Sequence, residues 1–415
     1  MVDRIRVVYA PVRYTHFMRY PLLTIDHRPS TIDHRLTMDV GINAHLLTFS
    51  QGYRNAGVGR YIYYLLRALA ERADQDGTRY TVFCHDAPRP GDLARGPRTS
   101  FVTSRLDTIE PKRRIIYEQA VLPWLLPGRV DLLHAPVNVV PLLSSVPTVV
   151  TVHDLAFMAM PERFLPAKRR YLEAFTRLTM RKARHVIADS AHTRDDLIRL
   201  LDVPPERVTA VPLGVNGDFR PPDDAAKAAF RTRENLPDHY LLYLGTLEPR
   251  KNLVALVRAY ARLRQSGLDW PLVLAGGKGW LYEDIFQAVE ESGLTEHVRF
   301  PGYVRYEDQP LWYGCATTFV YPSTYEGFGL PVLEAMACGT PVVCSNASSL
   351  PEAAGNAALL VDPHDEDALV AAVTRLAADE ALRADYSQRG LARAALFPWS
   401  RTAEETVGVY ALACD

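Results

Sequence analysis

The chain alternates short apolar runs with longer stretches in which apolar residues recur every three or four positions. From Met38 onward, runs such as Asp39–Asn43 and Thr148–Val152 have the length and composition of buried strands. Residues 57–72 and 252–264 instead place their apolar side chains on one helical face. Because strands and helices alternate throughout, the pattern predicts an α/β fold in which helices wrap parallel sheets.

Proline and glycine divide this pattern into two halves. Residues 202–224 hold five prolines and two glycines among few helix-forming residues, which predicts a hinge. We therefore expect one α/β/α domain over residues 38–215 and a second over 216–397, facing each other across a cleft. Residues 398–415 predict a C-terminal helix that packs across both domains.

The first 37 residues do not follow the pattern. The sequence TIDHR occurs at residues 24–28 and again at 31–35, and a strand is predicted directly after Met38. Two interpretations stay open: residues 1–37 are a disordered extension, or Met38 is the true start of the protein. The alternative to both is an arm packed on the first domain. Recovery of peptides from residues 1–30 of the natural protein would exclude the start-site interpretation.

Composition narrows the class of protein. A net charge of −1 gives no general affinity for nucleic acid, so we expect no nucleic-acid partner. The five cysteines are scattered and form no C-x-x-C pair, which indicates a reducing, cytoplasmic setting without disulfides or a zinc site. No apolar run reaches the roughly 18 residues that span a bilayer.

A segment with the features of a diphosphate site lies at residues 325–339, YEGFGLPVLEAMACG, between a predicted strand and a predicted helix. Free backbone amides and the helix dipole bind anions at such a helix start, and here the amides belong to Gly327, Phe328, Gly329 and Leu330. Glu326 and Glu334 flank this site with seven residues between them. Carboxylates accept hydrogen bonds from hydroxyls of a sugar or a ribose. The alternative is that Glu334 only solvates a helix face.

A cationic loop at residues 245–252, GTLEPRKN, also joins a strand to a helix. Arg250 and Lys251 are adjacent there, at the carboxyl end of a strand, where open α/β sheets bind ligands. Two cations at this position would neutralise a departing diphosphate. The alternative is a solvated surface pair.

Together these segments resemble the motifs of glycosyltransferase family four, and the resemblance runs from Met38 to the end of the chain. Members are retaining transferases of the GT-B fold, with two Rossmann-like domains. The resemblance implies that the first domain binds the acceptor and the second the nucleotide sugar. It also implies that Glu326 and Glu334 hold the donor's sugar and ribose, while Arg250 and Lys251 bind its diphosphate.

Further donor-side positions follow from the same resemblance: Gly245, Gly276, Tyr303 and Val304. On the acceptor side it implies a glycine loop and the residue after a catalytic histidine: Gly57, Val58, Gly59, Arg60 and Asp154. His153 ends a predicted strand and is expected to help catalysis together with Arg250, Lys251 and Glu326. Asp154 orients His153 or caps the next turn. A dehydrogenase fingerprint is disfavoured because Ile62 stands where its third glycine belongs.

The implied mechanism retains the anomeric configuration, with the departing phosphate accepting the acceptor's proton. Acidic pairs at residues 74–76 and 365–367 follow a helix and cap a helix, respectively. Neither is placed to meet the diphosphate, so we expect a nucleotide-sugar substrate, no metal and no other cofactor.

The donor and acceptor are less defined. Val152–Leu155, Pro161-Glu162 and residues 190–197 resemble bacterial mannosyltransferase-like members of polysaccharide biosynthesis, which favours GDP-mannose. A UDP-glucose or UDP-N-acetylglucosamine transferase or synthase stays open, as does a non-catalytic nucleotide-sugar or glycan-binding protein. The acceptor is a glycan or a lipid-linked glycan. Residues 167–184 carry seven basic residues against one acid, which fits peripheral contact with an anionic membrane or a solvated helix face.

Overall fold

The computed structural model describes residues 38–48, 57–86, 88 and 97–414. The described residues belong to one compact unit. The predictions for residues 1–37 lie outside them.

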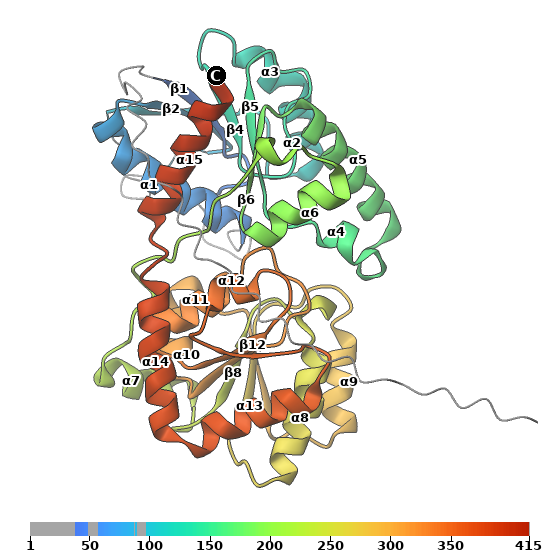
Figure 1. The fold of residues 1–415 in the computed structure, drawn as a ribbon, viewed down its shortest axis with the longest axis vertical. Helices are drawn as coiled ribbons and strands as arrows, with labels where there is room; N and C mark the ends of the chain where they lie inside the picture. Colours follow the sequence, from blue (N-terminus) through green and yellow to red (C-terminus); the bar gives the residue numbers. More distant parts are fainter. Residues whose placement is uncertain (1–37, 49–56, 87, 89–96, 415) are drawn as a thin grey trace, which may run out of the picture. The chain divides into compact units, whose positions relative to one another are not determined.

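The first half of the described chain forms a seven-stranded parallel sheet, ordered β3-β2-β1-β4-β5-β6-β7 (Figure 1). Its strands are β1 (Asp39–Asn43), β2 (Arg79–Cys84), β3 (Thr99–Thr103), β4 (Leu132–Ala135), β5 (Thr148–Val152), β6 (His185–Ala188) and β7 (Val208–Ala210). β4, β5 and β6 are buried along their whole length, and most of their residues are apolar, as expected of strands covered on both faces. In register, Val152 lies opposite Ala188, so the residues that follow these strands leave the sheet at one level.

The second half forms a six-stranded parallel sheet, ordered β10-β9-β8-β11-β12-β13. Its strands are β8 (Leu241–Leu244), β9 (Leu272–Ala275), β10 (Val298–Gly302), β11 (Thr318–Tyr321), β12 (Val342–Ser345) and β13 (Leu359–Val361). The strand order reverses between the paired strands β8 and β11. Loops that leave such a switch point diverge and expose backbone to a ligand. The cationic loop follows β8, and the GFG segment, which is Gly327 to Gly329, follows β11. The topology therefore brings the two loops together.

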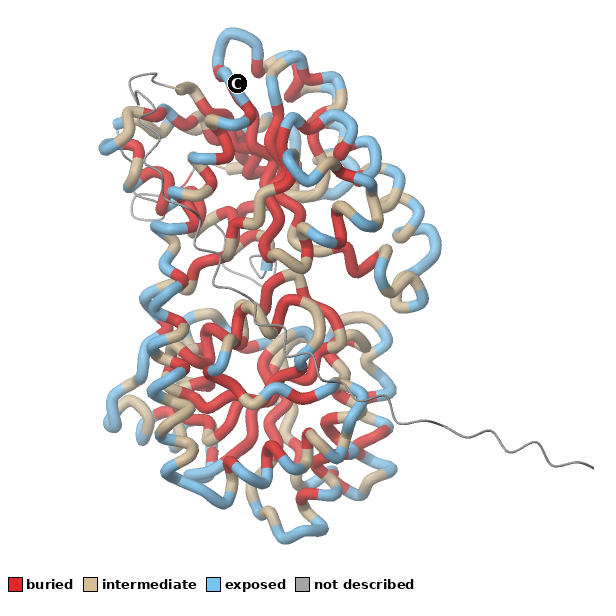
Figure 2. Tube along the Cα trace, in the orientation of Figure 1, coloured by how far each residue is buried: buried red, intermediate tan, exposed pale blue. Residues whose placement is uncertain are grey.

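Helices cover both sheets, and Figure 2 shows the buried positions concentrated along the strands between them. Around the first sheet lie α1 (Val58–Asp76), α2 (Pro111–Ile116), the π-helical η2 (Tyr117–Val121), α3 (Leu122–Leu125), α4 (Ala156–Ala159), α5 (Pro166–Lys182) and α6 (Ala191–Leu201). Around the second lie α7 (Asp224–Glu234), α8 (Leu253–Gln265), α9 (Glu283–Glu291), α10 (Gln309–Cys315), α11 (Leu330–Ala337), α12 (Leu350–Ala354), α13 (Glu366–Ala378) and α14 (Glu380–Ala394).

Several helix ends follow from local sequence. Ser190 caps α6 by accepting a hydrogen bond from the Thr193 amide, and Asp365 caps α13 in the same way. Asp365 therefore acts as the helix cap that the sequence predicted.

The last helix, α15 (Trp399–Cys414), returns to the first half of the chain and packs on α1 and on strands β4 to β6. Val215 and Pro398 form an isolated parallel bridge where the chain passes between the halves for the first and last time. Inside the first half, the Tyr410 hydroxyl lies 2.8 Å from Nδ1 of the buried His134. The C-terminal helix thus helps to fix strands β4 to β6, and the loop that carries His153 follows directly after β5.

Candidate active site

Lys251 is the most deeply buried cation of the cationic loop. It ends a short 3₁₀ turn, Pro249–Lys251, directly after β8. Its Nζ donates to Glu326 Oε1 at 2.5 Å and to the Tyr321 hydroxyl at 2.9 Å. The Lys251 side chain is 7% exposed and that of Glu326 9%. This burial rules out the alternative of a solvated surface pair for Lys251.

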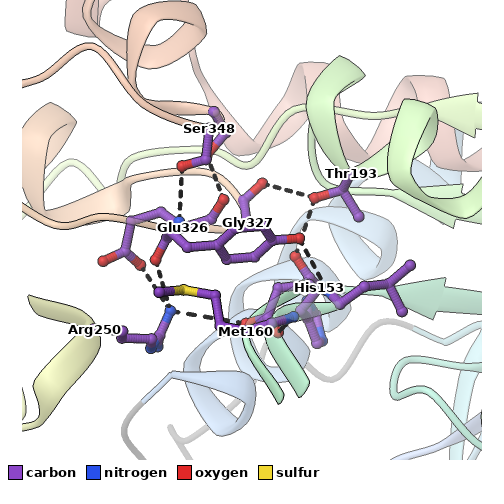
Figure 3. A network of polar contacts seen from close by, with 12 residues as sticks. His153, Met160, Thr193, Arg250, Glu326, Gly327 and Ser348 are labelled. Carbon is purple, nitrogen blue, oxygen red and sulfur yellow. Dashed lines mark hydrogen bonds and ion pairs between the residues drawn. The ribbon is translucent and has the colours of Figure 1, made fainter. Parts of the chain in front are cut away.

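Arg250 lies against the same carboxylate from another side (Figure 3). Its Nη1 is 3.3 Å from Glu326 Oε2 and donates to the Tyr325 carbonyl at 3.2 Å. Nε of the same guanidinium bonds Glu248, and Asp154 Oδ2 of the first half lies 3.9 Å away. A ring of acceptors thus holds the guanidinium in one orientation.

Electrostatics fix the charges of this cluster. Burial raises the pKa of the Glu326 carboxyl, but Lys251 and Arg250 outweigh it and hold the pKa at about 2. Burial and the neighbouring Arg250 lower the pKa of Lys251, against the opposing pull of Glu326. For Arg250 burial opposes the charge, yet Glu326, Asp154 and Glu248 raise its pKa well above the usual value. A buried lysine and a partly buried arginine therefore flank a carboxylate that is ionised at neutral pH.

The GFG segment is clamped by side chains of both halves. The Glu326 amide donates to Ser348 Oγ at 2.8 Å. The Gly327 carbonyl accepts from the hydroxyls of Ser190 and Thr193 at 2.6 and 3.1 Å (Figure 3). A Cβ at Gly327 would lie 1.8 Å from the His153 carbonyl oxygen. Only glycine allows the two backbones to approach this closely. The start of α11 is therefore held rigidly beside the end of β5.

Glu334 is buried in α11 rather than solvated, which corrects the alternative left open from sequence. Its Oε2 accepts from the Tyr313 hydroxyl at 3.1 Å and its Oε1 lies 3.4 Å from Arg60 Nη1. The same Arg60 atom donates to Gln309 Oε1 at 2.9 Å. Burial raises the pKa of Glu334, with Arg60 and Tyr313 acting against that rise. Arg60, expected on the acceptor side, thus contacts the carboxylate expected to hold the donor.

His153 follows β5 and is held by two acceptors. Its Nδ1 lies 2.7 Å from Asp189 Oδ2 and its Nε2 lies 2.9 Å from the Pro136 carbonyl oxygen. The Pro136 carbonyl can only accept, so Nε2 carries a hydrogen, and an ionised Asp189 accepting from Nδ1 favours the imidazolium form. Burial opposes this charge, but Asp189 raises the pKa of His153 above its usual value. Asp154 caps the next turn, accepting from the Ala156 amide at 3.0 Å, and does not contact the ring.

Sequence reasoning missed Asp189, which follows β6 directly. One signal in the sequence was that Asp189, like His153, directly follows a short β-rich run. Only the pairing of β5 with β6 places the two residues together, one residue beyond the pair of Val152 and Ala188. Tyr313, Tyr321 and Gln309 were also missed, because no local motif marks them.

The remaining predicted residues lie on other turns and helix starts of the two halves. Gly276 lies so close to Gly245 that a Cβ on it would meet the Gly245 carbonyl oxygen at 1.8 Å, so these two donor-side turns touch. Tyr303 is half exposed and Val304 buried, both just beyond β10. Phe328 packs its ring on Phe397, and Leu330 begins α11. On the acceptor side, Gly57 precedes α1, Val58 begins it, and Gly59 is buried within it.

Within the described ranges, His, Cys, Asp and Glu side chains form no group of three able to hold a metal ion. Among the described helices, none is both long and apolar enough to cross a membrane.

Two helix-covered parallel sheets, with the site at the switch point of the second, define the class of GT-B glycosyltransferases. The structure agrees in fold with sucrose-phosphate synthase from Thermosynechococcus elongatus, with a TM-score of 0.71 and 24% identity over 90% of this chain and 98% of that one. It agrees equally with WaaG, a glycosyltransferase involved in lipopolysaccharide biosynthesis, with a TM-score of 0.69 and 16% identity over 89% and 99% of the two chains.

Sequence comparison then names the family. Residues 55–219 match the model of Glycosyltransferase Family 4, and residues 224–393 match that of Glycosyl transferases group 1. O-antigen chain mannosyltransferase B of Escherichia coli is 39% identical over 266 residues, covering 64% of this chain and 70% of the relative. The serotype-specific mannosyltransferase WbdA of E. coli is 33% identical over 264 residues; the match covers 62% of this chain and only 32% of the relative. The chain belongs to glycosyltransferase family four and is a glycosyltransferase.

Proposed function

We propose that this enzyme transfers mannose from GDP-mannose to a hydroxyl of a glycan or lipid-linked glycan, with retention of configuration. The observation that carries the proposal is the buried cluster of Arg250, Lys251 and Glu326 beside the free amides of α11. Such an arrangement fits a diphosphate between the cations and amides, and sugar hydroxyls on the carboxylate. The names of the relatives, which are mannosyltransferases, favour mannose as the sugar.

Donor binding would exchange partners within the cluster. The diphosphate would pair with Arg250 and Lys251, which in the structure are paired with Glu326. The Glu326 oxygens would then accept hydrogen bonds from hydroxyls of the sugar. Glu334 accepts hydrogen bonds from the ribose hydroxyls. Burial raises the pKa of its carboxyl, and Arg60 of the first half supports the ionised form. We therefore assign Arg60 to the donor side.

In the transfer step the bond from the anomeric carbon to the diphosphate breaks as the acceptor oxygen attacks from the same face. The acceptor's proton passes to the departing phosphate oxygen, so the step balances without a protein nucleophile. Charge grows on the diphosphate, and Arg250, Lys251 and the α11 amides stabilise that charge. His153 adds a fixed positive charge, because both of its nitrogens are engaged by Asp189 and Pro136. We propose that these groups make a metal ion unnecessary.

The acceptor and its setting are inferred from charge. The exposed face of α5 carries basic side chains, and an acceptor anchored in lipid would be met at an anionic bilayer surface. We propose that the enzyme works peripherally on the cytoplasmic face of the membrane.

A donor panel tests the proposal. Nucleotide release would be measured with GDP-mannose, UDP-glucose, UDP-N-acetylglucosamine and ADP-glucose, each with mannose-terminated oligosaccharides and with or without EDTA. We expect release of GDP from GDP-mannose alone, unchanged by EDTA. Arg250→Ala should abolish it, whereas Arg375→Ala, an exposed arginine of α13, should not. Release of UDP or ADP, or loss of activity in EDTA, would contradict the donor or the metal-independent mechanism.

A further inference from the structure

Large apolar side chains are unusually exposed on one part of the first half. Ile116 is 58% exposed, Trp124 76% and Leu143 70%. Ile116 and Trp124 belong to the continuous helical run α2–η2–α3, whose solvent-facing positions recur at residues 112, 116, 120 and 124. Leu143 lies beside this run, because the Gln119 side chain bonds the Val140 carbonyl and the Leu142 amide, each at 3.0 Å. We call Ile116, Trp124 and Leu143 the apolar tips.

Basic side chains lie on the same helical run as these tips and on the neighbouring helix α5. Lys112 and Arg113 are exposed at the start of the same helical run. Helix α5 lies beside it, because Val140 bonds both: its carbonyl accepts from Gln119 of η2 at 3.0 Å and its amide donates to the Thr179 hydroxyl of α5 at 3.3 Å. Solvent-exposed positions of α5 add four cations, Arg170, Arg177, Arg181 and Lys182.

Acidic side chains on this surface are already neutralised. Glu110 pairs with Arg113 at 2.8 Å and Glu173 with Arg169 at 3.3 Å. The surface therefore presents a net positive charge around isolated apolar tips. Among these tips is a tryptophan, the residue type that favours the interface between water and lipid.

We infer that α2, η2, α3 and the outer face of α5 form a docking surface for an anionic lipid bilayer. The cations meet lipid phosphates while Trp124, Ile116 and Leu143 enter the headgroup region. A second copy of the chain fits less well, because two such positive surfaces would repel each other. The inference deepens the proposed function, since its use rests on an acceptor held in lipid.

The test measures binding of the whole protein to vesicles without donor or acceptor. Wild type should co-sediment with vesicles of phosphatidylglycerol and phosphatidylcholine, but not with phosphatidylcholine alone, and high salt should release it. Lys112→Glu with Arg113→Glu should weaken binding by roughly tenfold or more. Trp124→Ser should weaken it by several-fold. Quenching of tryptophan fluorescence by brominated lipid should disappear in Trp124→Phe.

Two controls make the outcome specific. Leu412→Ser removes another exposed leucine, on α15, and Arg375→Glu reverses a charge on α13; neither should alter vesicle binding. Every variant should retain nucleotide release with a soluble acceptor, so loss of lipid binding alone leaves the proposed reaction standing. Wild type that ignores anionic vesicles, variants that bind like wild type, or a dimer that Trp124→Ser dissociates would overturn the docking surface.

Discussion

Lys251 is a buried cation whose charge depends on its hydrogen-bond partners. A buried ammonium is costly unless it is paired and hydrogen-bonded. Lys251 meets both conditions through Glu326 and Tyr321. Arg250 beside it is paired in turn with Glu248 and Glu326. The fold thus stabilises two cations in the place where a diphosphate is proposed to bind.

Lys251→Ala should lower turnover by about a hundredfold or more, because a single preorganised contact to developing charge contributes roughly 3–4 kcal/mol. Steady-state nucleotide release measures this effect. Thermal unfolding run in parallel separates it from a loss of fold, since the variant leaves Glu326 buried with Arg250 as its remaining cationic partner. Turnover within a few-fold of wild type in a folded variant would remove Lys251 from the mechanism.

Glu326 predicts a pH dependence of stability. Its folded-state pKa of about 2 lies below the usual 4.5, so its ionised form stabilises the fold above pH 4.5. This contribution, roughly 3 kcal/mol when complete, is lost as the pH falls from about 4.5 toward 2. The unfolding free energies of wild type and Glu326→Gln should therefore converge as the solution is acidified. A difference that stays constant with pH would show that the carboxylate is not held ionised by Lys251 and Arg250.

Arg60 distinguishes two assignments of the same residue. If it supports Glu334 at the ribose, Arg60→Gln should raise the KM for the donor by roughly tenfold and change kcat less, since the ribose contact contributes equally to the ground state and the transition state. The KM for the acceptor should stay as in wild type. The reverse pattern would return Arg60 to the acceptor side, as its sequence resemblance first implied.

At the scale of elements, α6 links the two halves. Its first amides, of Ala191 and His192, donate to the Glu352 carboxylate of α12 at 2.8 and 2.7 Å. Its cap residue Ser190 holds the Gly327 carbonyl, and Asp196 accepts from the Tyr325 hydroxyl at 2.6 Å. The start of α6, whose amides bind the Glu352 carboxylate, thus also positions residues 325–329, which we call the donor loop.

Glu352→Ala should lower stability by about 1–3 kcal/mol, because two helix amides lose a charged acceptor. It should also raise amide hydrogen exchange at residues 190–193 and 325–329 and lower turnover several-fold. Glu290→Ala, an exposed glutamate of α9, serves as the matched control. Faster exchange confined to residues 190–193 would show that α6 does not hold the donor loop.

Predictions from sequence were most accurate for individual secondary-structure elements and the loops between them. The predicted strands Asp39–Asn43 and Thr148–Val152 coincide with β1 and β5, because short buried strands have a recognisable length and composition. The cationic and GFG loops were recognised because each is a contiguous motif. The partners of Arg60 and His153 were not, since Glu334 and Asp189 lie 274 and 36 residues away and are brought near only by packing and register.

At the scale of the whole molecule, the site is composite. The cations and both glutamates come from the second half, while Arg60, His153, Ser190 and Thr193 come from the first. Residues from both halves must therefore be in place before the donor loop takes its described form. This dependence fits a transferase that assembles its site from two domains, and fold alone would not identify the reaction.

The most direct test of the account is the configuration of the product. Wild type would be given GDP-α-mannose and a mannose-terminated oligosaccharide, and the one-bond carbon–proton coupling at the new anomeric centre would be measured by NMR. The account predicts an α-mannoside, formed on the face from which the diphosphate departs. A β-mannoside, or no mannosylated product while another nucleotide sugar is consumed, would contradict it.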